Sequence, residues 1–237
     1  TVLVAPFFRT EPTGDPADFY WSGNGWRDGR ESRNSNKISS FAALDAFIEQ
    51  LADTTHFPVL DQIIVTGQSS GGLFTHTYAA ANRSERTFKD IRFDYLVSES
   101  QYFYYPDGQR INENTNQLYT PSGCSGYDIW PLGYDVVPPY VSATDKQSLD
   151  EQLVKRNITY ILGNGSGTDN SLNTTDCSAT LLGSSRYQRG ENMFRYMELR
   201  YPGVHQHNKL IVPGVTHEGS AIYQSSEFRM LLEDLLR

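Results

Sequence analysis

The sequence predicts an α/β fold: a mostly parallel sheet with helices covering both of its faces. Two patterns predict it. Short runs of apolar, often β-branched residues recur along the chain, and segments with apolar residues at helical spacing separate them. A strand that is followed by a helix pairs in parallel with the next strand, because the crossover returns the chain to the same edge of the sheet. The expected strands are residues 2–5, 62–66, 93–98, 158–162 and 209–212.

The segments between these strands have helical spacing. In the first of them, apolar residues at positions 41, 44, 48 and 51 lie on one face, and Ser39 or Ser40 can cap its N-terminus. Further helices are expected from about residue 70 to Asn82, over 145–155, over 189–199 and from 219 to Arg237. No internal repeat and no linker divides the chain, so we expect one domain over residues 1–237.

Two long segments lack periodicity. Residues 9–37 are rich in Pro, Gly, Asn and Asp, which predicts a surface loop held to the body by its aromatic residues. Residues 101–147 are dense in Tyr, Pro, Gly and Asn and read as a loop-rich insertion. Because ligands bind at the carboxyl ends of parallel strands, an insertion that follows a strand is well placed to shape a pocket.

Composition excludes several classes of partner. The net charge is −8, which argues against binding to nucleic acid or to an anionic membrane surface. No apolar run approaches the ~20 residues that a bilayer span needs. Hydrophobic residues make up 38% of the chain, and the 15 tyrosines among them can bury large areas while keeping a polar end.

A G-x-S-x-G motif at residues 67–71 follows the expected strand 62–66 directly and precedes a helical segment. A strand, this motif and a helix in that order form a nucleophile elbow. The turn is so tight that we expect both of its glycines to be required. It exposes the hydroxyl of Ser69 above the sheet, and the backbone N–H of Ser70 can stabilise a developing oxyanion. Ser70 is the rival nucleophile, but its offset from Gly67 is wrong.

A serine nucleophile needs a base, and His217 is the best placed of the five histidines. It follows the last expected strand and therefore lies at the same edge of the sheet as Ser69. The chain order Ser, Asp, His of α/β-hydrolase triads is then satisfied. The remaining histidines fit capping, packing or surface positions: His56, His76, His205 and His207.

The orienting carboxylate should follow strand 158–162. The loop after that strand holds Asp169 and Asp176. Asp169 is closer to the strand end, where an orienting acid belongs, whereas Asp176 abuts Cys177 and fits a solvated loop position. Both remain candidates at this point.

Five segments carry a resemblance to a known family: residues 67–72, 98–105, 133–141, 177–190 and 212–217. In them the chain resembles a poorly characterised group of α/β-hydrolases found in fungi and bacteria, and the resemblance covers nearly its whole length. It implies the α/β-hydrolase fold, with Ser69, Asp169 and His217 as the triad. It implies no substrate.

One feature departs from that fold. An early strand of α/β-hydrolases ends in a His-Gly-type loop that supplies the second N–H of the oxyanion hole, and no such strand precedes Thr1. The loss of one donor can cost about 3 kcal/mol in the transition state. We therefore expect a further N-terminal segment, either continuous with this chain or a separate fragment of the same protein, that completes the sheet.

The two cysteines and four glycosylation sequons favour a secreted protein. The sequons begin at Asn82, Asn157, Asn164 and Asn173. A disulfide between Cys124 and Cys177 would persist in the secretory pathway and would contribute roughly 4 kcal/mol by closing a loop of about 50 residues. Two free thiols are the alternative.

Serine, histidine and aspartate without a metal-binding or nucleotide-binding motif predict acyl transfer to water with no cofactor and no metal. The expected activity is hydrolysis of a carboxylic ester, in a small molecule or a polymer, through an acyl-enzyme on Ser69. A serine peptidase or amidase on the same scaffold is one alternative. A secreted binding protein that retains the fold without catalysis is another.

Overall fold

The computed structural model describes residues 1–237 and contains a four-stranded sheet in which every pair of neighbours is parallel. The predicted parallel sheet is thus confirmed. Its spatial order is β1-β2-β5-β6, so strands that follow one another through helical crossovers lie side by side. The strands are β1 (Gln62–Gln68), β2 (Arg92–Ser98), β5 (Asn157–Gly163) and β6 (His207–Val212).

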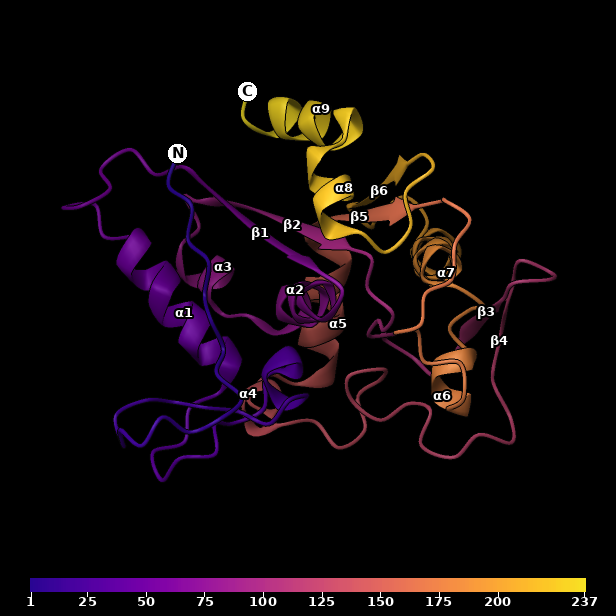
Figure 1. Cartoon of the computed structure of the whole chain (residues 1–237), viewed down its shortest axis with the longest axis horizontal. Coiled ribbons are helices and arrows are strands. Elements are labelled where there is room, and N and C mark those ends of the chain that lie inside the picture. The colour runs from indigo at the N-terminus through magenta and orange to yellow at the C-terminus, as the bar shows by residue number, and fades with distance from the viewer.

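Helices cover both faces of this sheet (Figure 1). The larger core lies between one face and helices α1, α2, α5 and α7. The smaller core lies on the other face, where Ile222 and Phe228 of α8 and α9 pack on β2, β5 and β6. The helices are η1 (Gly25–Asp28), α1 (Ser40–Leu51), α2 (Ser70–Ala81), α3 (Ser84–Thr87), α4 (Pro139–Ser142), α5 (Lys146–Lys155), α6 (Cys177–Thr180), α7 (Arg186–Arg200), α8 (Gly219–Gln224) and α9 (Ser226–Leu235).

Side-chain caps determine where several helices begin. Ser39 accepts a hydrogen bond from the backbone N–H of Phe41 and starts α1, as its sequence predicts. Ser185 caps α7 in the same way, so this helix begins three residues earlier than its apolar spacing suggests. Ser225 caps α9 and separates it from α8, which divides the single C-terminal helix expected from the sequence.

Residues 2–5 do not form the strand that their composition predicts. They belong to no strand, and Leu3 in this segment is 91% exposed. An extended segment gains its stability from hydrogen bonds to a neighbouring strand, and this one has no such neighbour. β1 is likewise paired on one side only, with β2, and forms the edge of the sheet.

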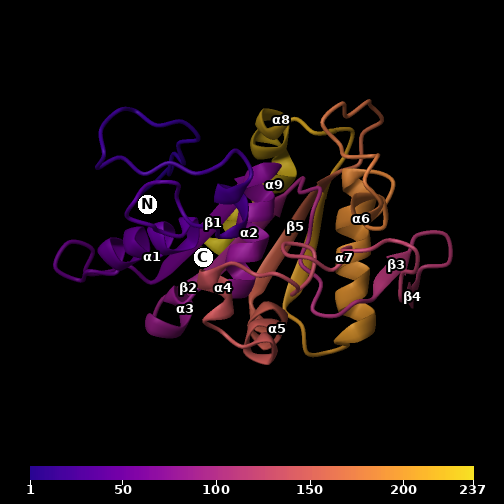
Figure 2. The same cartoon turned by 90° about the horizontal axis from the view of Figure 1, so that it is seen from below.

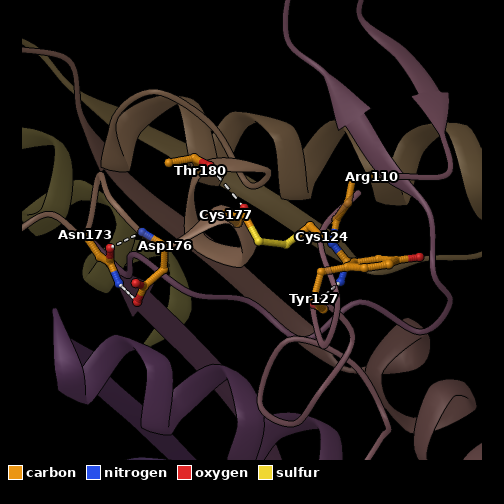
Figure 3. The surroundings of a disulfide bond; sticks show 7 residues. All are labelled: Arg110, Cys124, Tyr127, Asn173, Asp176, Cys177 and Thr180. Atoms are coloured by element: carbon orange, nitrogen blue, oxygen red, sulfur yellow. Dashed lines mark hydrogen bonds between the residues drawn. A yellow bond between two sulfur atoms is a disulfide. The ribbon is translucent and has the colours of Figure 1, made fainter. Parts of the chain in front are cut away.

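The insertion 101–147 contains the antiparallel hairpin of β3 (Arg110–Asn112) and β4 (Gln117–Tyr119), which lies beside α7 (Figure 2). The predicted disulfide between Cys124 and Cys177 is present and joins the insertion to α6 (Figure 3). The buried guanidinium of Arg110 pairs with Asp128 at 2.9 Å and braces the insertion from inside. None of the helices is long and apolar enough to cross a bilayer.

Candidate active site

Ser69 occupies a strained turn between β1 and α2. Its φ of 57° and ψ of −110° lie in a region that side chains rarely adopt. The backbone N–H of Ser69 donates a 2.9 Å hydrogen bond to the carbonyl of Ser98, which anchors the turn to the end of β2. This is the backbone geometry of a nucleophile elbow, as the motif predicts.

Close backbone contacts explain some of the glycines around Ser69. A Cβ on Gly67 would lie 2.2 Å from the carbonyl oxygen of Gly71, and one on Gly72 would lie 2.5 Å from that of Ser98. At Gly71 a Cβ would meet no atom within 4 Å. The steric requirement therefore falls on positions 67 and 72, and the expectation that it also falls on 71 was wrong.

Ser70 is the first residue of α2. The earliest intrahelical hydrogen bond of this helix runs from the N–H of Leu73 to the carbonyl of Ser69. The N–H groups of the first turn have no partner within the helix, as helix geometry requires. That of Ser70 is therefore free of the helix, next to the hydroxyl-bearing residue.

The loop after β6, which contains His217, approaches the strand end that precedes Ser69. Gly219, two residues further on, lies so close to Gln68 that a Cβ there would be 3.1 Å from the Gln68 Cγ. Nδ1 of His217 is 3.7 Å from Oδ1 of Asp169 and 3.4 Å from Oγ of Ser171. Its Nε2 is buried and has no hydrogen-bond partner in the protein. The imidazole thus has a carboxylate on one side and an uncommitted nitrogen on the other.

Burial and the groups around His217 favour a neutral imidazole and an ionised Asp169. Burial lowers the pKa of His217, and the positive charge of Arg186 lowers it further against the opposing effect of Asp169. Burial alone would raise the pKa of Asp169, but hydrogen bonds from Ser171 and Arg186 outweigh it and bring the pKa to about 2. A neutral imidazole beside an ionised carboxylate is the protonation state that a general base needs.

Arg186 is a buried residue of the site that the sequence did not single out. Its side chain is 3% exposed. Nε pairs with Oδ2 of Asp169, Nη2 donates to Oγ of Ser171 at 2.9 Å, and Nη1 donates to the backbone carbonyl of Glu99 at 3.0 Å. It therefore holds the loop of Asp169 against the end of β2.

Glu99 is a second residue that sequence reasoning missed. It has a φ of 47° and is 2% exposed, directly after β2. Its Oε1 accepts a 2.6 Å hydrogen bond from the N–H of Gly163. Burial raises the pKa of this carboxyl to about 7 despite that hydrogen bond and the charge of Arg186. A glutamate after a strand is a weak signal in a sequence, because its burial depends on how the strands pair.

The geometry distinguishes the two candidate acids. Asp176 is exposed, precedes α6 and accepts a 2.7 Å hydrogen bond from the side chain of Asn173 (Figure 3). It makes no contact with His217. Asp169 alone of the two lies beside the imidazole, as its shorter distance from the strand end suggested.

The other histidines lie elsewhere. His76 and His207 are buried, and their Nε2–H groups donate to the backbone carbonyls of Tyr104 and Leu153, respectively. His56 is exposed and pairs with Asp53 at 2.8 Å. None of these three bonds Asp169 or Ser69.

The four sequon asparagines differ in accessibility. Asn82 is fully buried, and its amide donates to the carbonyl of Tyr78 and the hydroxyl of Tyr95, so this folded state leaves no room for a glycan there. Asn173 is half-buried and its amide is also engaged. Asn157 and Asn164 are exposed. A glycan is therefore compatible with this folded state at Asn157 and Asn164 but not at Asn82.

A cavity of about 520 Å³ lies along α5 and is bounded on the other side by Tyr201 and Val204. None of its lining residues belongs to the loops of Ser69, Asp169 or His217. The candidate site is therefore identified by the side chains of Ser69, Asp169 and His217 and not by this cavity.

No protein-family model matches the sequence, and no curated protein sequence matches it. Among solved structures, the chain is similar to the poly(3-hydroxybutyrate) depolymerase LpqC from Bordetella parapertussis, with a TM-score of 0.61 and 16% identity over 86% of this chain and 63% of that one. It is also similar to poly(aspartic acid) hydrolase-1 from Sphingomonas sp. KT-1, with a TM-score of 0.56 and 19% identity over 81% of this chain and 62% of that one. The chain thus spans less than two thirds of both structures, and the likeness shows that it has the α/β-hydrolase fold.

Proposed function

We propose that the chain is a serine hydrolase that cleaves a carboxylic ester through an acyl-enzyme on Ser69, with His217 as the base and Asp169 as its orienting acid. The observation that carries the proposal is the strained backbone of Ser69 at the carboxyl end of β1. Strain of this kind is maintained where function needs it. The neutral imidazole beside an ionised Asp169 supports the same assignment.

In the first half of the reaction, Nε2 of His217 removes the proton from the Ser69 hydroxyl, and the oxygen attacks the carbonyl carbon of the ester. The negative charge that develops on the carbonyl oxygen is stabilised by the N–H of Ser70. The intermediate collapses to the acyl-enzyme, and His217 gives its proton to the departing alcohol. Water then attacks the acyl-enzyme by the same steps and releases the acid.

Asp169 accepts a hydrogen bond from the Nδ1–H group of His217 and so fixes the tautomer in which Nε2 is the base. In this structure the Nδ1–Oδ1 distance is 3.7 Å, and Nε2 has no partner. Catalytic hydrogen bonds are often longer before substrate binds and shorten in the complex. We expect both contacts of the imidazole to tighten in that way.

The substrate class is open between esters and amides. The two similar structures are named for a polyester depolymerase and for a poly(aspartic acid) hydrolase. A peptidase or amidase activity is therefore the second candidate, and the same triad chemistry serves both. Each polymer name describes that protein and not this chain. For this chain we first expect an ester substrate, either a small molecule or a polymer.

The disulfide and the accessible sequons at Asn157 and Asn164 support secretion of the protein. The net charge of −8 supports the absence of nucleic acid and anionic membrane partners. Purification from culture medium, with mass analysis of glycopeptides, tests the first point.

Labelling with a fluorophosphonate probe tests the proposed function. The probe forms a covalent bond with an activated serine, so the protein should be labelled and Ser69→Ala should not be. Ser70→Ala keeps its backbone N–H and should still be labelled at Ser69, which excludes the neighbouring hydroxyl as the nucleophile. Absence of labelling in the unaltered protein would favour the binding-protein alternative. A panel of short acyl esters and peptides then separates esterase from peptidase activity.

A further inference from the structure

Arg27 places a positive charge beside Ser70, the residue that follows the proposed nucleophile. It lies in η1, in a segment that the sequence describes only as a surface loop, and its Nη1 donates a 3.3 Å hydrogen bond to Oγ of Ser70. Ser70 follows Ser69 directly, so the guanidinium lies one residue from the hydroxyl that attacks the substrate.

The protein itself does not neutralise this charge. No carboxylate oxygen lies within the 4.0 Å ion-pair distance of Arg27. The adjacent carboxylate, Asp28, pairs with Arg30 at 3.2 Å. Three buried arginines, Arg110, Arg156 and Arg186, do pair with a carboxylate; Arg156, for example, pairs with Glu85 at 2.8 Å. The guanidinium next to the proposed nucleophile therefore carries a charge that no side chain of the protein neutralises, although the net charge of the chain is −8.

The backbone of Arg27 is fixed in place. Its carbonyl accepts a 3.3 Å hydrogen bond from the hydroxyl of Thr77 in α2. The next carbonyl, that of Asp28, accepts a 2.7 Å hydrogen bond from the buried indole of Trp130 in the insertion. A side chain that extends from an anchored backbone loses less freedom when it binds a ligand than one on a mobile loop.

The guanidinium of Arg27 also has N–H groups that bond no protein atom. Nη1 bonds the neutral hydroxyl of Ser70 and Nε makes a long 3.5 Å contact with the carbonyl of Asn24, whereas Nη2 donates to no protein atom. The residue is half-buried. Guanidinium groups bind carboxylates through two parallel N–H donors, and such charge-assisted bonds are among the strongest in proteins.

We infer that Arg27 binds a carboxylate of the substrate next to the scissile bond, so that the preferred substrates are esters that carry a free carboxylate. This inference rests on the proposed function of Ser69. The carboxylate could belong to the acyl part, as in a monoester of a dicarboxylic acid, or to the alcohol part, as in an ester of a hydroxy acid. The chemistry at Arg27 is the same in both cases.

Two pairs of esters distinguish these sources. Monoethyl succinate and ethyl pentanoate differ in a carboxylate on the acyl side. O-Acetyl-lactate and sec-butyl acetate differ in one on the alcohol side. A charge-assisted hydrogen bond corresponds to roughly a tenfold or larger preference in kcat/KM for the charged ester of at least one pair. In Arg27→Gln this ratio should fall towards one, and Arg27→Lys should retain part of it.

Arg33→Gln is the matched control, because Arg33 lies in the same segment, is exposed and forms no ion pair. It removes the same charge and should keep the ratio of the unaltered protein. The labelling of Ser69 by an uncharged fluorophosphonate in Arg27→Gln shows that the variant has folded with an active serine.

The possible results separate the inference from the proposed function. An unaltered protein that hydrolyses both esters of each pair equally, or an Arg27→Gln variant that keeps the preference, overturns the role of Arg27 and leaves the hydrolase proposal standing. A protein that hydrolyses no ester and is not labelled at Ser69 overturns the proposed function and this inference with it.

Discussion

Arg186 shows how much of the candidate site depends on a residue outside the triad. It joins Asp169, Ser171 and the carbonyl of Glu99, which are 17, 15 and 87 residues away in the chain. The positions of Ser69, His217 and Asp169 in the segments that follow β1, β6 and β5 could be predicted, because each of these strands is recognisable in the sequence. Arg186 could not, because its contacts arise only when the ends of β2 and β5 meet.

We predict that Arg186→Gln lowers kcat more than it changes KM, because Asp169 loses the partner that holds it. The acid limb of the pH profile should also move to higher pH. The positive charge of Arg186 lowers the pKa of His217, so its removal raises that pKa and the base stays protonated to a higher pH. Arg195→Gln, a half-buried position on the same helix that forms its ion pair with Glu198, is the control. An unchanged profile with reduced kcat would assign Arg186 a purely structural role.

A second prediction concerns the glycines of the elbow. Gly67→Ala should abolish labelling of Ser69, because the new Cβ would lie 2.2 Å from the carbonyl oxygen of Gly71. Gly71→Ala should preserve the fold, since a Cβ there meets nothing within 4 Å and alanine favours a helix. Thermal unfolding and probe labelling of the two variants measure the difference. Equal damage from both would contradict the steric account.

At the scale of elements, the apolar spacing predicted where strands and helices lie, and caps and pairing decided their ends. The helix expected at 189–199 begins at Arg186 because Ser185 caps it. Residues 2–5 have the composition of a strand but no neighbour to bond, which no local pattern can reveal. The C-terminal helix divides at Ser225, whose hydroxyl accepts from the N–H of Phe228.

Buried ionisable groups on these elements predict how stability varies with pH. Burial lowers the pKa of His76 on α2 to about 4 and that of His207 on β6 to about 3. Burial raises that of Glu99 to about 7. Between about pH 4.5 and 6.5 the unfolded chain therefore binds two more protons at the histidines and one fewer at Glu99. Because the histidines outweigh Glu99, the combined effect of these three groups is that the free energy of unfolding should rise with pH in this window.

Glu99→Gln removes the opposing contribution, so its stability should depend more steeply on pH than that of the unaltered protein. The difference between the two slopes should be about 1.4 kcal/mol per pH unit, the value for one proton. Urea unfolding at a series of pH values between 4.5 and 6.5 measures both. Parallel curves would mean that Glu99 has the same proton affinity folded and unfolded.

At the scale of the whole molecule, the edge of the sheet at β1 stands out. Its apolar residues Ile63, Ile64 and Val65 are typical of an interior strand, yet β1 pairs with β2 alone. Natural sheet edges usually carry charges, prolines or bulges that prevent further pairing, and these residues provide none. Leu3 and Val59 are also strongly exposed apolar residues.

We therefore propose that the free edge of β1 pairs with a further strand of polypeptide. Intact mass under denaturing conditions, on protein isolated from its natural source, should reveal additional polypeptide. Hydrogen exchange should show the outward N–H groups of β1 protected in that material. A mass that corresponds to residues 1–237 alone, with fast exchange along β1, would contradict it.

The central claim is that His217 and Asp169 activate Ser69, and the rate of fluorophosphonate labelling in four proteins tests it most directly. His217→Gln and Asp169→Asn should react at least roughly a hundredfold more slowly than the unaltered protein, because general-base catalysis contributes factors of this size. Asp176→Asn should react at the rate of the unaltered protein, since that carboxylate is exposed and does not contact the imidazole. Equal rates in all four would contradict the assignment of the triad.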